Sequence, residues 1–206
     1  MELAEGRAAG WALILSAGMT VAAMGHHPVH AQAAAANNIV HGLLIGLAGL
    51  AAFGFLHWSL IRGLSRPAVA AGLVAYLLAT LANVGAAIIN GFVVVALAKA
   101  GGSSPELNRF AWETNQALAG LGVFATGAAY GLWSIDLLRR GASLERTVGL
   151  AGLVFGLAPP VLIVTGILRM NLTGALLIYA AQMMWMASLG LLVLKLAKRR
   201  AAAGPS

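Results

Sequence analysis

The sequence contains no cysteine and very little charge. Its 206 residues include 6 acidic side chains and 13 Lys or Arg, so charged residues make up 9% of the chain against 60% hydrophobic ones. The absence of cysteine excludes disulfides, thiolate metal sites and cysteine nucleophiles. A soluble domain carries about 25% charged residues, and a chain of this size has too little interior to bury so much apolar surface. We therefore expect an integral membrane protein.

Several motifs of soluble catalysis are also absent. The chain has no glycine loop that would cradle a phosphate, no His-Glu-x-x-His pair and no Ser-His-Asp arrangement. Its net charge of +7 comes from basic residues at the ends of apolar runs rather than on one basic face. This distribution favours the lipid bilayer as partner and not nucleic acid. Without a long polar segment, residues 1–206 are expected to form a single membrane domain.

Six apolar runs set the expected fold, because about twenty apolar residues cross a bilayer as a helix. These runs cover residues 10–24, 39–60, 68–98, 110–135, 147–168 and 172–194. The first run needs its flanks to reach across. The third is longer than a straight crossing requires, so it must tilt, protrude or break, and Gly91 is the candidate position. We expect an all-α bundle of six transmembrane helices.

The basic residues predict the orientation of this bundle. With six spans, ten Lys and Arg fall on the side of the two termini, and only Lys99, Arg109 and Arg169 fall on the other. The positive-inside rule then places both termini in the cytoplasm of a bacterial inner (plasma) membrane. An alternative is that the first run is a secretory signal, cleaved near "Ala31-Gln32-Ala33". Glu2 and Glu5 argue against it, because they make the leader net negative.

Four of the five histidines lie in one stretch, "MGHHPVHAQAAAANNIVHGLL", from Met24 to Leu44. They are His26, His27, His30 and His41. Neutral imidazole binds metal ions and haem iron, and it titrates near neutral pH. Three interpretations stay open: a polar loop at the membrane edge, a metal ion or haem b site that includes a carboxylate such as Glu113, and a proton sensor.

Polar side chains inside the apolar runs form a second group of candidates, because polar groups are costly within a bilayer. Several share one face of an expected helix, which indicates either hydrogen bonds between helices or a polar cavity. Glu113 can also be explained as a carboxylate favoured by a helix N-terminus. Asn171 lies eleven residues before Gln182, so the two share one helix face. The candidates for a polar cavity are Tyr76, Thr80, Asn83, Asn90, Glu113, Asn115, Gln116, Arg169 and Gln182.

Three glycine pairs have the spacing that lets helix backbones approach closely. They are Gly42/Gly46, Gly127/Gly131 and Gly152/Gly156. Such seams pack helices within one chain, and they are also candidate contacts for a homo-oligomer or a membrane complex. The pair Pro159-Pro160 in the fifth run should bend its helix.

Short motifs resemble a family of small bacterial multi-span membrane proteins without an established activity. They are "Met24-Gly25-His26-His27-Pro28", "Val40-His41-Gly42", "Asn90-Gly91-Phe92-Val93" and "Asn115-Gln116-Ala117". The resemblance implies six spans, an outer His-Pro step and a histidine at the start of the second span. A fainter resemblance is to membrane isomerases of the styrene oxide isomerase and hydroxylaminobenzene mutase type. The matching pieces are "His41-Gly42-Leu43-Leu44" and "Asn83-Val84-Gly85". That likeness implies haem-dependent isomerisation, although the order of the helices differs.

These observations lead to one main hypothesis and two alternatives. The main hypothesis is a transporter-like or sensor-like membrane protein with an outward-facing polar site for a metal ion, a proton or a small ligand. One alternative is a haem- or metal-dependent membrane oxidoreductase or isomerase. The other is a non-catalytic membrane subunit that contacts its partners through the glycine seams.

Overall fold

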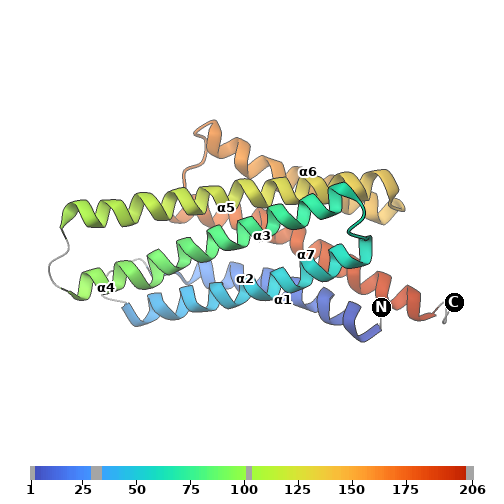
Figure 1. Cartoon of the computed structure of the whole chain (residues 1–206), viewed down its shortest axis with the longest axis horizontal. Helices are drawn as coiled ribbons and strands as arrows, with labels where there is room; N and C mark the ends of the chain where they lie inside the picture. The colour runs from blue at the N-terminus through green and yellow to red at the C-terminus, as the bar shows by residue number, and fades with distance from the viewer. Residues whose placement is uncertain (1–2, 29–33, 101–103, 203–206) are drawn as a thin grey trace.

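The computed structural model describes residues 3–28, 34–100 and 104–202, which are almost entirely helical (Figure 1). The helices are α1 (Leu3–Gly25), α2 (Ala34–Arg62), α3 (Pro67–Ile88), α4 (Val94–Lys99), α5 (Pro105–Arg140), α6 (Ser143–Val164) and α7 (Leu172–Ala202). A π-helical turn, η1 (Ile89–Val93), joins α3 to α4. Within this described part, six helical units are long and apolar enough to cross a membrane, with Pro67–Lys99 counted as one. The prediction of six helices in an all-α fold is confirmed.

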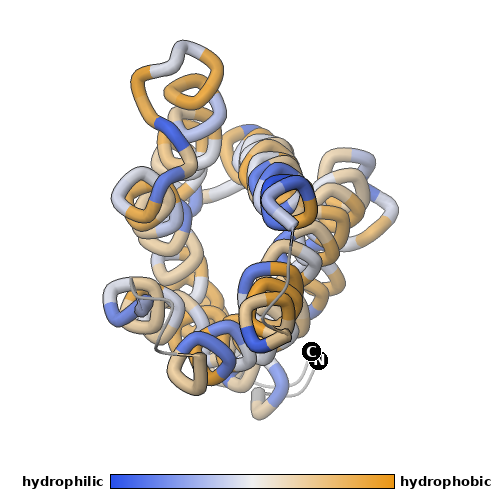
Figure 2. The backbone as a smooth tube through the Cα atoms, turned by 90° about the vertical axis from the view of Figure 1, so that its left-hand side faces the viewer, coloured by the Kyte–Doolittle hydropathy of each residue, from blue (hydrophilic) through white to orange (hydrophobic). Residues whose placement is uncertain are grey.

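The helices are arranged as a closed ring. Each packs against its neighbours in the order α1, α2, α3, α5, α6 and α7, and α7 returns to α1. Figure 2 looks at this ring end-on. Both termini lie at one end (Figure 1), where α2 ends at Arg62 and α5 at Arg140. We call this the arginine end, and we call the opposite end, where α1 ends at Gly25 and α2 begins at Ala34, the histidine end.

Aromatic side chains fill the middle of the ring. Phe55, Tyr76, Tyr130, Trp133 and Trp185 are all buried, and the rings that contact each other have centres between 4.1 and 6.4 Å apart. Two indoles also tie helices together: Trp133 donates to the Val69 carbonyl at 3.2 Å and Trp185 to the Val148 carbonyl at 2.8 Å. This aromatic core leaves the interior closed toward the arginine end.

A network of charged side chains joins α2, α5, α6 and the residue that precedes α3 at the arginine end. Asp136 of α5 pairs with Arg62 at the end of α2, with 2.5 Å between Arg62 Nη2 and Asp136 Oδ2. Arg62 Nη1 also donates to Glu145 of α6 at 2.7 Å, and Arg66 lies 3.3 Å from Asp136. Only 5% of the Asp136 side chain is exposed. Sequence reasoning did not identify this network, because its members are up to 83 residues apart.

Two of the three predicted glycine pairs pack against each other inside the chain. A Cβ on Gly127 of α5 would lie 2.6 Å from the Gly156 carbonyl oxygen of α6. Only glycine permits backbones to approach this closely. The third pair is different, since Gly42 and Gly46 are exposed on α2. A role for that pair in contacts with another chain stays a prediction.

The helix of the third apolar run does not break at Gly91, but it changes from α-helical to π-helical there. Residues 89–93 form the π-helical turn η1, with Gly91 at its centre, and α4 then continues to Lys99. A π turn holds one extra residue per turn; such turns are rare and are frequently found at functional sites. The excess length seen in the sequence is therefore accommodated partly by a local change of helix type.

Candidate functional site

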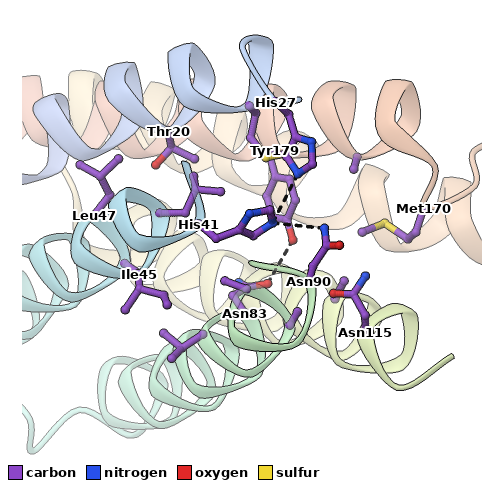
Figure 3. Close-up of a pocket in the computed structure, with 18 of the residues that line it drawn as sticks. Thr20, His27, His41, Ile45, Leu47, Asn83, Asn90, Asn115, Met170 and Tyr179 are labelled. Carbon is purple, nitrogen blue, oxygen red and sulfur yellow. Dashed lines mark hydrogen bonds between the residues drawn. The ribbon is translucent and has the colours of Figure 1, made fainter. Parts of the chain in front are cut away.

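A cavity of about 410 Å³ lies inside the ring, in the half next to the histidine end. Its lining residues come from α1, α2, α3, η1, α5 and α7, together with residues just outside α1 and α7. Figure 3 shows the polar side chains that point into it. Pro28, Trp112 and Met170 lie toward its mouth, whereas Ala51, Tyr76 and Met186 reach down to the aromatic core. At its inner end the cavity is thus bordered by residues of that core.

His41 is the most buried histidine of the described chain, with 4% of its surface exposed. It lies in the second turn of α2, and its Nδ1 is 2.8 Å from the carbonyl oxygen of Asn37 one turn earlier. Because a carbonyl can only accept, Nδ1 carries the hydrogen and Nε2 is left as an acceptor. Gly91 packs directly against the Cβ of His41, so α2 and η1 are in close contact at this point.

Side-chain amides from the first turn of α2 fix η1 in place. Asn37 Nδ2 donates to the Asn90 carbonyl at 2.9 Å. Asn38, with its amide oriented so that both ends find partners, donates to the Gly91 carbonyl at 2.7 Å. These bonds satisfy carbonyls at the π turn and lock the register between the two helices. The bonds therefore join α2 to η1 at the rim of the cavity, where His41 and Asn90 meet.

His27, His41 and Asn90 form the most concentrated polar group of the cavity (Figure 3). The two Nε2 atoms of His27 and His41 are 3.3 Å apart, and Asn90 Nδ2 lies 3.1 Å from His41 Nε2. His27 Nδ1 is 3.1 Å from the carbonyl oxygen of Pro28. The rings stand nearly perpendicular, at 83°. Two elements, α2 and η1, and the segment after α1 thus place three nitrogen-bearing side chains close together.

A second polar pair lies across the cavity. The Tyr179 hydroxyl of α7 donates to Asn83 Oδ1 of α3 at 3.1 Å, and Asn115 and Gln116 of α5 complete the polar lining. No Asp, Glu, Lys or Arg appears among the described residues that line the cavity. The remaining lining is mainly Ala, Leu, Ile, Val and Met. This combination suits a neutral ligand with an apolar body and a few polar atoms.

The structure brings seven of the sequence candidates together at the cavity. They are His27, His41, Tyr76, Asn83, Asn90, Asn115 and Gln116. His26 points elsewhere, with its Nδ1 2.8 Å from the Ala22 carbonyl oxygen, and His30 lies outside the described residues.

The other candidates do not line the cavity. Glu113 is 65% exposed and faces Arg109 at 3.9 Å on the same helix. Arg169 is exposed. Thr80 donates to the Tyr76 carbonyl at 2.9 Å, within its own helix. Gln182 is buried and donates to the Val123 carbonyl at 3.3 Å, which links α7 to α5.

Asn171 receives a local role as well. Its Oδ1 accepts the backbone N–H of Gly174 at 2.8 Å, which caps the N-terminus of α7. Asn171 also lines the mouth of the cavity. The face that Asn171 shares with Gln182 is thus explained by a helix cap and a buried interhelical bond.

Sequence reasoning missed Asn37, Asn38 and Tyr179. The two asparagines carried a signal, because they lie four and three residues before His41 and so share its helix face. No pattern in the sequence marked Tyr179, because its partner Asn83 is 96 residues away. Among the described residues, no three His, Cys, Asp or Glu side chains converge as they would in a dense metal centre. The site is instead two histidines supported by amides.

Comparisons with known proteins assign no family to the chain. No protein-family model matches it, and no curated protein and no solved structure gives a significant match. The resemblances inferred from short motifs stay predictions, and function rests on the cavity itself.

Proposed function

We propose that this chain is a multi-pass protein of a bacterial plasma membrane, with both termini in the cytoplasm, that binds a small neutral amphiphile from outside the cell. In this orientation the histidine end faces outward. The proposal is supported by the thirteen Lys and Arg residues, ten of which fall on the side of the termini in a six-span topology. It is a transporter-like or sensor-like role.

The observation that carries the proposal is the cavity itself. Its volume of about 410 Å³ is within the range of about 300–1,000 Å³ typical of small-molecule sites. The lining is mostly apolar, and its polar groups gather at two places, His27/His41/Asn90 and Asn83/Tyr179. Two separate polar points on an apolar wall fix the orientation of a ligand, as specific sites do.

The aromatic core at the inner end of the cavity favours a binding role over a continuous channel. Below the cavity, Phe55 and Trp133 stack with ring centres 4.7 Å apart, and the Arg62–Asp136 pair holds the helices together at the arginine end. A ligand that enters from the histidine end would stop at this core. Such a site fits a sensor, or one state of a transporter that opens alternately to each side.

Cysteine labelling tests the proposal directly, because the natural chain contains no cysteine. Ala87→Cys on α3 and Ala119→Cys on α5 place a thiol on the lining of the cavity. Spheroplasts carrying these variants are treated from outside with a small, charged methanethiosulfonate, which reacts with thiolates in contact with water. We expect both positions to be modified.

Two further variants serve as controls. Ala100→Cys lies exposed beyond α4 at the histidine end and should react fully. Ala128→Cys is exposed on α5, half a turn around the helix from Ala119, so in a bilayer it faces lipid and should stay unmodified. Modification of Ala128→Cys alone, or of neither Ala87→Cys nor Ala119→Cys while Ala100→Cys reacts, would refute an outward-opening aqueous cavity.

A further inference from the structure

We propose that His27 and His41 bind one divalent transition-metal ion, of the Zn²⁺ or Cu²⁺ class, with Asn90 as third ligand. This inference rests on the proposed function, because the ion reaches the pair through the cavity. It deepens that function by placing a Lewis acid at one of the two polar points. A neutral ligand with a hydroxyl or carbonyl oxygen would then bond to the ion.

The hydrogen-bond partners of both histidines leave the same atom available. His27 Nδ1 faces the Pro28 carbonyl at 3.1 Å and His41 Nδ1 faces the Asn37 carbonyl at 2.8 Å. Each Nδ1 must therefore carry a hydrogen, so each neutral ring presents its Nε2 lone pair. A carbonyl bound to the second ring nitrogen is the support that metal-ligating histidines commonly have. Two acceptor nitrogens that face each other repel unless a cation or a hydrogen lies between them.

The spacing of the two nitrogens fits two ligands of one ion. Zinc–nitrogen bonds of about 2.0–2.1 Å at the corners of a tetrahedron place neighbouring nitrogens about 3.3–3.4 Å apart. The measured Nε2–Nε2 distance is 3.3 Å.

The distance between the ring centres also favours two ligands of one ion. A straight N–H···N bond would place the ring centres about 5.6 Å apart, because each centre lies about 1.15 Å behind its nitrogen. The ring centres of His27 and His41 are only 4.9 Å apart. The rings therefore meet at an angle, as ligands on neighbouring corners of an ion do, rather than head-on through a shared proton.

Asn90 supplies the third corner. Its Nδ2 lies 3.1 Å from His41 Nε2, and a half-turn of the amide exchanges its nitrogen and oxygen, which brings Oδ1 to the ion. The fourth corner faces the cavity and is open to water or ligand. Imidazole nitrogens select zinc, copper and nickel over magnesium and calcium. Because the described lining contains no carboxylate, the ion keeps its positive charge for an incoming oxygen.

The first test measures metal binding by the purified full-length chain, carrying an affinity tag without histidine and stripped with a chelator. We expect calorimetry to show one Zn²⁺ per chain. With Cu²⁺ in place of Zn²⁺, electron spin-echo envelope modulation (ESEEM) spectroscopy should show two coordinated imidazoles in the natural chain and one in His27→Ala. The matched control is His26→Ala, which removes the neighbouring exposed histidine and should leave both results unchanged.

The expected losses separate ligation from a general effect on folding. His27→Ala and His41→Ala should each weaken Zn²⁺ binding at least about tenfold, because even second-shell changes cost 10–100-fold. Asn90→Asp should instead tighten it by about tenfold, since a carboxylate is a better zinc ligand than an amide. A gain of affinity cannot come from misfolding, so this variant is informative even if His41→Ala is unstable.

Several outcomes would overturn the metal site. They are no stoichiometric Zn²⁺ or Cu²⁺, binding that His26→Ala abolishes, binding that Asn90→Asp weakens, and a haem absorption band that disappears in His41→Ala. Failure here is distinguishable from failure of the proposed function. If Ala119→Cys reacts from outside but no metal binds, the cavity stands without an ion. If Zn²⁺ binds in detergent but Ala119→Cys is inert in spheroplasts, the metal site stands and the outward cavity does not.

Discussion

Gly91 lies so close to His41 that a Cβ at position 91 would overlap the Cβ of the histidine. The contact joins η1 to α2 at the rim of the cavity, and the amides of Asn37 and Asn38 hold the same two elements together. The position of the His41 ring therefore depends on a glycine, a π turn and two asparagines. The glycine, the π turn and the two asparagines all help to position this imidazole.

The first prediction is that Gly91→Ala destabilises the protein and displaces His41. The added methyl group meets atoms close to the backbone of α2, which cannot rotate away, so we expect a loss of about 1–3 kcal/mol. Thermal unfolding in detergent, followed by the fluorescence of the five tryptophans, measures it. Gly46→Ala is the control, because no atom lies within 4 Å of its Cβ position, and it should be neutral or stabilise by up to about 1 kcal/mol. Equal effects of the two substitutions would contradict the role of the contact.

Much of the fold could be predicted from the sequence because a bilayer imposes simple constraints. Six apolar runs gave six helical units, and the third run was long enough to require an irregularity, which the structure places at Gly91 as η1. The type of irregularity could not be foreseen, since it depends on amides of α2 that bond to η1. Hydropathy fixes the number of spans and says nothing of such partners.

The candidate site was predictable only where polar residues shared a helix face. Tyr76, Asn83 and Asn90 recur every seven residues and all line the cavity. Thr80 does not, because its hydroxyl donates to the Tyr76 carbonyl, a common local bond for Thr in helices. Pairing between distant segments left no trace in the sequence. The Tyr179–Asn83 bond and the Arg62–Asp136 pair are examples, separated by 96 and 74 residues.

The second prediction concerns the charged network at the arginine end. Asp136→Asn preserves the shape of the side chain but removes the charge that faces Arg62, whose side chain is only 11% exposed. Breaking a buried ion pair by changing one partner costs about 3–5 kcal/mol, because a charge is left uncompensated. Unfolding in detergent should show a loss of that order.

A surface pair provides the control for this network. Glu113→Gln removes the partner of Arg109, but both side chains are mostly exposed, at 81% for Arg109 and 65% for Glu113. Exposed pairs contribute at most about 1 kcal/mol, so the stability should hardly change. If Asp136→Asn is equally silent, the network does not hold the arginine end together.

The third prediction concerns the seam between α5 and α6. In Gly127→Ala the new methyl group would lie 2.6 Å from the Gly156 carbonyl oxygen, so the helices must separate, at a cost of about 1–3 kcal/mol. Gly120→Ala on the same helix has no atom within 4 Å of the added Cβ and should be tolerated. Melting temperatures of the two variants make the comparison. Tolerance of Gly127→Ala would show that the seam can relax.

The fourth prediction is that both ends of the chain lie in the cytoplasm. The arginine end carries the Arg62, Arg66 and Asp136 network, and the chain termini lie beside it (Figure 1). Basic residues are retained on the cytoplasmic side during insertion, so a fluorescent protein fused after Ser206 should fluoresce. Alkaline phosphatase fused after Ala100, at the histidine end, should be active, because it folds only when exported. Active phosphatase after Ser206 would mean an odd number of spans or an inverted bundle, and His41 would then face a different compartment.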